Sequence, residues 1–85
     1  MERLRHRSEF RAVARGRKVT RPGFVLQALA TGEAPRGPRF GFTVTKKTGN
    51  AVVRNRIRRR LREAVRLSAA GAAMSGVDYV LIGRR

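Results

Sequence analysis

The chain has 85 residues, enough for one small domain, and carries 21 lysines and arginines against 5 acidic residues, a formal net charge of +16. This imbalance opposes compaction through self-repulsion, so we expect a polyanionic partner that also stabilises the fold. The absence of cysteine excludes a disulfide framework and a thiolate metal site. We find no apolar run of membrane-spanning length and no secretory signal, and we therefore expect a cytoplasmic protein.

The first half of the chain predicts one short helix followed by strands. Ser8 is a candidate N-cap for a helix that ends near residue 15, with Phe10, Val13 and Ala14 on one face. A very short strand fits at 18–20. Residues 24–30 form an apolar run of strand length, and residues 39–45 alternate apolar with small or polar side chains, which is the period of a half-buried strand. These two runs should pair as an antiparallel hairpin across a wide, mobile loop at 31–38.

The second half predicts a strand–helix–strand unit. Asn50 is a candidate N-cap for a helix over 51–67, a small-residue connection follows, and 77–83 forms an apolar strand. Two strands joined through a helix should run parallel. The fold class we predict is α+β, an α/β sandwich in one small domain, with the order helix–strands–helix–strand around a mixed sheet. On general grounds the crossover should be right-handed.

The helix at 51–67 combines an apolar stripe with dense positive charge, since nine lysines and arginines lie between positions 46 and 66. At about 100° per residue, an arc of roughly 120° collects the aliphatic side chains Val53, Ile57, Leu61, Ala64 and Val65. Most arginines fall outside this arc, while Arg54 falls inside it in the first turn. The stripe should hold the helix on the sheet, and the arginines should face an anion, because guanidinium groups fork two donors onto phosphate. A GC-rich genome is an equal explanation for the excess of arginine over lysine.

The acidic residues show no pattern of a catalytic or metal site. The five acids, Glu2, Glu9, Glu33, Glu63 and Asp78, are scattered and lack metal-ligand spacing. We therefore expect no catalytic side chain and no metal held by the protein alone.

One long motif has a clear counterpart among known families. Residues 45–64 read T-K-K-T-G-N-A-V-V-R-N-R-I-R-R-R-L-R-E-A, which resembles the arginine-rich signature of the protein subunit of bacterial ribonuclease P. The resemblance extends in order to the segments 8–17, 24–29, 39–47 and 78–84, so it covers nearly the whole chain.

The resemblance implies a role in tRNA 5′ maturation. Ribonuclease P is an endonuclease that removes the 5′ leader of precursor tRNA, and its active site belongs to a catalytic RNA with bound Mg²⁺. The protein subunit steadies that RNA, raises its affinity for metal ions and holds the leader. The resemblance also implies that the crossover between the two parallel strands is left-handed, against the general expectation. The expected partners are the RNA subunit and precursor tRNA, with a monomeric free protein and no membrane.

The resemblance also assigns site residues. The residues expected to face the catalytic RNA are Lys46, Lys47, Arg54, Asn55, Arg56, Arg58, Arg59 and Arg62. The leader should enter a cleft between the first helix and the sheet, lined by Phe10 and Val13 and floored by the strand that carries Phe40 and Phe42. The alternative for each phenylalanine is a place in the core, which is the commoner use of this residue.

The chain departs from the family in two places. Ala14 stands where family members often carry a second aromatic residue on the first helix. Family chains also continue after the last strand into a C-terminal helix that residues 1–85 do not contain. The remaining alternative function is a ribosomal or other structural RNA-binding protein, whose composition and fold plan would look the same.

Overall fold

The computed structural model describes residues 2–31, 37–69 and 76–83, so most of the loop expected at 31–38 and of the connection after 67 lies outside the described residues. The elements follow the predicted order, with the strand β1 added before the first helix. They are β1 (Glu2–Arg3), α1 (Arg7–Val13), β2 (Arg17–Arg21), β3 (Phe24–Ala30), β4 (Arg39–Thr43), the 3₁₀ turn η1 (Lys46–Thr48), α2 (Ala51–Ala64), the π-helical turn η2 (Val65–Ala69) and β5 (Val77–Gly83).

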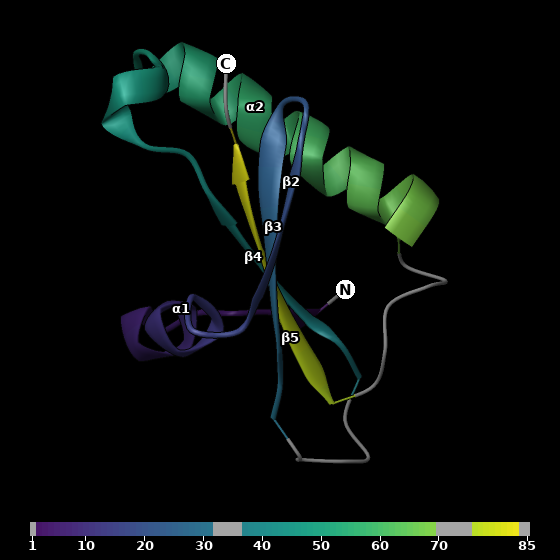
Figure 1. Ribbon diagram of the computed structural model, residues 1–85. Coiled ribbons are helices and arrows are strands. Elements are labelled where there is room, and N and C mark those ends of the chain that lie inside the picture. Colours follow the sequence, from purple (N-terminus) through teal and green to yellow (C-terminus); the bar gives the residue numbers. More distant parts are fainter. Residues whose placement is uncertain (1, 32–36, 70–75, 84–85) are drawn as a thin grey trace.

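The strands form one mixed sheet in the order β1-β4-β5-β3-β2, which confirms the predicted fold class (Figure 1). β4 and β5 are parallel, as the strand–helix–strand pattern predicted. The predicted hairpin between the runs at 24–30 and 39–45 is wrong, because β5 lies between them and pairs with both. β3 instead forms its hairpin with β2, which is two residues longer than the strand expected at 18–20.

The sheet has an apolar cluster on each face, because successive side chains of a strand point to opposite sides. On one face Phe40 and Leu81 pack with Leu61 of α2 and Val65 of η2. On the other face Val80 packs with Leu4 and with Val13 of α1. The two helices therefore cover opposite faces of the sheet (Figure 1).

α2 begins and packs as its sequence predicts. The side chain of Asn50 accepts a hydrogen bond from the backbone N–H of Val53 at 3.0 Å, which is N-cap geometry. Ile57 comes so near β5 that a Cβ on Gly83 would lie 2.5 Å from an Ile57 methyl carbon. The aliphatic stripe thus holds α2 on the sheet, and Gly83 is the residue that lets it approach.

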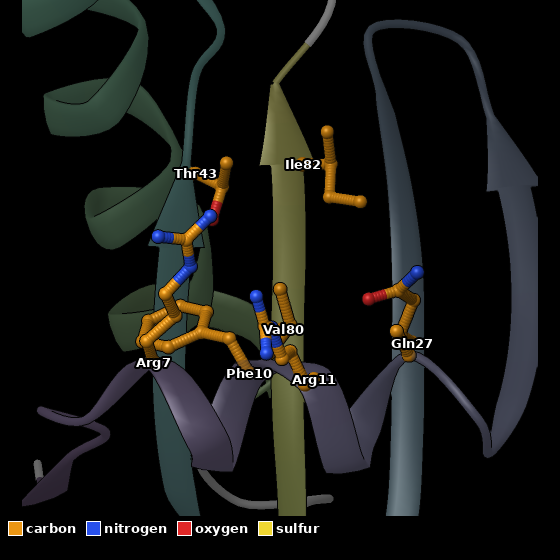
Figure 2. Close-up of a pocket in the computed structure, with 8 residues that line it drawn as sticks. Arg7, Phe10, Arg11, Gln27, Thr43, Val80 and Ile82 are labelled. Atoms are coloured by element: carbon orange, nitrogen blue, oxygen red, sulfur yellow. The ribbon is translucent and has the colours of Figure 1, made fainter.

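The crossover from β4 to β5 is left-handed. Figure 2 views the sheet from the α1 side, with β4, which carries Thr43, to the left of β5, which carries Val80 and Ile82, and with both strands running upward. The connection through α2 passes on the far face, so the path turns in the left-handed sense. The rule that favours right-handed crossovers in about 98% of cases fails here, and the expectation drawn from the family resemblance is confirmed.

The N-terminal segment before α1 pairs with the edge of the sheet. β1 pairs in parallel with β4, and the N–H of Leu4 donates to the carbonyl of Phe40 at 2.9 Å. α1 starts after His6 rather than at Ser8, because the Glu9 carboxylate accepts the backbone N–H groups of Arg5 and His6, each at 2.9 Å. A carboxylate in the first turn thus replaces the predicted serine cap.

Candidate nucleic-acid interface

The outward side of α2 is covered by cationic side chains. Arg56, Arg59 and Arg60 are exposed, and Arg58 and Arg62 are half-buried. Exposed Lys46 and Lys47 of η1 lie at the start of the same helix. We call this set of seven side chains the α2 arginine surface. Within the described ranges no acidic side chain pairs with any of them, so the positive charge is open to an external anion.

Two further residues of the predicted RNA-binding set have distinct surroundings. Asn55 is exposed, and its amide oxygen accepts a hydrogen bond from Arg58 at 3.0 Å, which orients that guanidinium group and leaves the amide N–H₂ outward. Arg54, which falls inside the apolar sector in the first turn, is half-buried. Its Nε is buried and has no hydrogen-bond partner among the described residues.

The acids that the structure describes serve the fold. Arg39 donates to both carboxylate oxygens of Asp78, at 3.0 and 2.7 Å, and to the Glu9 carboxylate at 2.7 Å. The side chain of Asp78 is only 5% exposed. We call these three residues the Arg39 ion triad; it joins α1, β4 and β5. On the surface Glu63 pairs with Arg66 one turn later.

The triad was missed in the sequence because its members are 30 and 39 positions apart. Its one sequence signal is Asp78 itself, an acidic residue inside an otherwise apolar strand. An acid in that place needs a partner when it is buried.

An open cleft lies between α1 and the sheet, as the resemblance predicted (Figure 2). Its volume is about 320 Å³. α1 lines it with one aromatic and two basic side chains, and the sheet supplies its floor from β3, β4 and β5. The lining residues are Arg7, Phe10, Arg11, Ala14, Gln27, Thr43, Val80 and Ile82.

The predicted floor of the cleft is wrong by one residue along β4. Phe40 is 4% exposed and packs with Phe42 in the cluster beneath α2, on the far face of the sheet. Gly41 and Thr43 face α1 instead, and the Phe10 ring lies so close above Gly41 that a Cβ there would meet it at 2.4 Å. Val13 is fully buried between α1 and the sheet, so it supports the cleft without lining it. Of the four predicted residues, Phe10 alone lines the cleft.

The ion triad and the helix start set the acid response of the fold. Hydrogen bonds from the backbone N–H groups of His6 and Arg5, with a smaller contribution from the Arg39 charge, lower the pKa of Glu9 from 4.5 to about 2. Ionised Glu9 therefore stabilises the folded state fully above pH 4.5, and this stabilisation is lost as the pH falls toward 2.

We expect acid to destabilise the wild-type domain more than a Glu9→Gln variant. The carboxylate contributes at most about 3 kcal/mol at neutral pH, from the size of its pKa shift. Melting temperatures measured from pH 6 to 2.5 should show wild type above the variant at pH 6 and the two curves converging near pH 2.5. If the two curves of melting temperature against pH stay parallel over this range, Glu9 is not the group responsible. The comparison with the variant corrects for the general charge repulsion in a highly cationic chain, which both proteins share.

Two classes of site find no support in the described ranges. No set of three histidine, cysteine or acidic residues there is arranged to hold a metal ion. No helix there has the length and apolar character needed to cross a bilayer.

The fold and the two basic sites define a small α+β domain of the kind that binds nucleic acid. The family model for ribonuclease P matches residues 1–85, so the chain belongs to the ribonuclease P protein family. It is 63% identical over 83 residues to the ribonuclease P protein component of Gluconacetobacter diazotrophicus, covering 96% of this chain and 71% of that relative. It is 47% identical over 92 residues to the same component of Brucella suis, covering 96% of this chain and 63% of that relative.

Solved structures agree with this assignment. The RNase P protein from Thermotoga maritima superposes with a TM-score of 0.80 at 32% identity, covering all of this chain and 76% of that one. The RNase P protein from Staphylococcus aureus superposes with a TM-score of 0.81 at 28% identity, covering 99% of this chain and 75% of that one. The chain therefore has the role of a protein subunit in an RNA-based endoribonuclease.

Proposed function

We propose that the chain binds the catalytic RNA of ribonuclease P through the α2 arginine surface and takes up the 5′ leader of precursor tRNA in the cleft beside α1. The observation that carries this proposal is the absence, in the described ranges, of any carboxylate paired with the cations of that surface. Seven adjacent positive groups repel one another, and an RNA backbone relieves that repulsion. Asn55 completes the contact by presenting its amide N–H₂, and Arg54 adds its positive charge from a half-buried place in the first turn of α2.

The chemistry belongs to the RNA partner in this proposal. Glu9 and Asp78 are the acids that the fold brings together, and both are bound to Arg39, so they do not fit a metal site. Magnesium ions held by the RNA subunit supply the Lewis-acid chemistry of phosphodiester cleavage. The protein contributes positive charge, which lowers the repulsion between two RNA molecules, and a binding site for the leader.

Reconstitution with the RNA subunit tests the proposed function. Adding the chain should restore cleavage of precursor tRNA at a magnesium concentration too low for the RNA alone, and the chain without RNA should not cleave. If the chain binds RNA but leaves cleavage unchanged, it is a structural RNA-binding protein, and the proposal is wrong.

The α2 arginine surface should act through phosphate contacts. We expect Arg58→Ala and Arg62→Ala each to weaken binding to the RNA subunit and to lower the slope of log K against log salt by about one. The matched control is Arg66→Ala, which removes the same charge where Glu63 already neutralises it, so its slope should change less. Binding is measured by filter retention over a salt series; equal slopes for all four proteins would contradict this placement.

A further inference from the structure

The Arg39 ion triad lies on the same face of the sheet as the cleft. Three pairs of neighbouring residues follow one another along that face of β4 and β5, namely Arg39 with Asp78, Gly41 with Val80, and Thr43 with Ile82. The first pair belongs to the triad, the second packs beneath the Phe10 ring, and the third lines the floor of the cleft. α1 therefore lies between a layer of ion pairs on one side and the open cleft on the other.

Apolar contacts hold α1 on the sheet from its middle to its C-terminal end. Val13 is fully buried and packs with Val80, and Phe10 packs against the same cluster. In the first turn, by contrast, Arg7 and Ser8 are exposed. A helix of seven residues is too short to be stable on its own, so the position of this turn depends on what attaches it to the sheet.

The Glu9 carboxylate attaches the first turn of α1 with both of its oxygens. One oxygen accepts the backbone N–H groups of Arg5 and His6, each at 2.9 Å, and closes the corner before the helix. The other oxygen accepts a hydrogen bond from Arg39 of β4 at 2.7 Å. Arg39 is itself fixed by two hydrogen bonds to the buried Asp78 of β5. The first turn is thus attached to a guanidinium group that two strands hold in place.

Glu9 does not line the cleft, but it lies between residues that do. The lining residues of α1 recur at helical spacing and so share one side of the helix; they are Arg7, Phe10, Arg11 and Ala14. Figure 2 shows α1 crossing the strands, with Arg7 near β4. Any shift of the first turn therefore moves Arg7 and Phe10 relative to Thr43 on the floor of the cleft.

We propose that Glu9 and Arg39 are positioning residues of the cleft, because the ion pair between them fixes the first turn of α1 above β4 and so sets the width of the cleft. This inference rests on the proposed uptake of the leader there. Without the pair, the first turn moves away from the sheet while Val13 keeps the other end in place. In a wider cleft one nucleotide no longer contacts both α1 and the floor, so the leader binds more weakly.

The test replaces Glu9 with glutamine, which has nearly the same shape but only one acceptor oxygen. That oxygen can serve the backbone N–H groups or Arg39, so one half of the attachment is lost. Asp78 keeps its guanidinium partner in this variant. The stability control is Val65→Ala, which removes buried volume from the cluster beneath α2, on the opposite face of the sheet from α1. Circular dichroism sets a temperature at which wild type and both variants are folded.

Affinity of the assembled holoenzyme for precursor and for mature tRNA is the first measurement. We expect Glu9→Gln to weaken binding of the precursor by roughly tenfold, a factor comparable to the stacking of one base, and to leave binding of mature tRNA unchanged. Val65→Ala should match wild type with both ligands. An equal loss for the two variants would show that the effect comes from general destabilisation, which overturns the inference.

The position of α1 in the free protein is the second measurement. The sequence has no cysteine, so a pair of introduced cysteines can carry spin labels at chosen places. Ser8 of α1 and Thr20 of β2 are exposed and do not line the cleft. In the Ser8→Cys, Thr20→Cys background, pulsed EPR should give a narrow distance distribution for wild type and Val65→Ala and a broader one for Glu9→Gln. An unchanged distribution in Glu9→Gln would show that apolar contacts alone position α1, which also overturns the inference.

The comparison of precursor with mature tRNA separates this inference from the proposed function. If the wild-type holoenzyme prefers the precursor and Glu9→Gln prefers it by the same factor, the role of Glu9 is wrong and the leader cleft stands. If the wild-type holoenzyme binds both tRNAs equally, the proposed uptake of the leader fails, and the positioning role fails with it.

Discussion

Replacing Arg39 with methionine should unfold the domain or leave it barely stable. The substitution keeps much of the aliphatic stem but removes three hydrogen bonds, two to Asp78 and one to Glu9. The Asp78 carboxylate, only 5% exposed, then loses the guanidinium group that donates two hydrogen bonds to it. Loss of one partner from such a pair costs about 3–5 kcal/mol, which is comparable to the whole stability of a domain this small. Urea unfolding followed by circular dichroism measures the loss.

The matched control for Arg39 is Arg66, which pairs with Glu63 on the surface. There the two side chains are 64% and 54% exposed, so water and salt screen the interaction. Arg66→Met should therefore leave the urea midpoint nearly unchanged. Equal decreases in the urea midpoint for the two variants would show that burial of the Arg39 ion triad does not increase its contribution to stability.

Leu61→Ala should have the second-largest effect, by emptying the cluster beneath α2. Leu61 is 7% exposed and packs with Phe40, Val65 and Leu81. Truncating a buried leucine removes transfer free energy and leaves a cavity, at a cost of about 2–5 kcal/mol. The expected signature is a lower urea midpoint, with weaker RNA binding only under conditions where the variant is unfolded.

The neighbouring residue Arg60 gives the comparison for Leu61. It is exposed, whereas Leu61 is buried against the sheet, so Arg60→Ala should leave the urea midpoint close to that of wild type. Should Arg60→Ala unfold the domain while Leu61→Ala does not, the assignment of the two sides of α2 is reversed.

Local patterns predicted the elements of this fold well. The aliphatic stripe of α2, its Asn50 cap and the parallel pairing of β4 with β5 each depend on a short stretch of sequence, and the structure confirms them. The order of the strands could not be predicted in the same way. β3 and β4 are neighbours in the sequence, yet β5 separates them, because strand order is decided by which apolar faces meet in the folded sheet.

The cleft shows the limit of a periodic pattern. Alternation along β4 correctly placed Phe40 and Phe42 on one face, but it does not say which helix covers that face. We expected α1 to cover the face that carries Phe40 and Phe42, but α2 covers it. The prediction therefore named these two residues as the floor of the cleft, where the structure has Gly41 and Thr43. Gly41 holds the missing signal, since a glycine between two aromatic residues indicates a close approach by another group, here the Phe10 ring.

The placement of the two helices on opposite faces of the sheet has a consequence for how the proposed contacts combine. An RNA subunit docked on α2 leaves the far side of the sheet, with its cleft, uncovered. A precursor whose tRNA body is already held by that RNA offers its leader to the cleft as a tethered ligand. The local concentration of such a ligand is in the millimolar range for a short flexible link. Even a cleft that binds a free oligonucleotide weakly would then raise the affinity of the assembled enzyme for precursor tRNA above its affinity for mature tRNA.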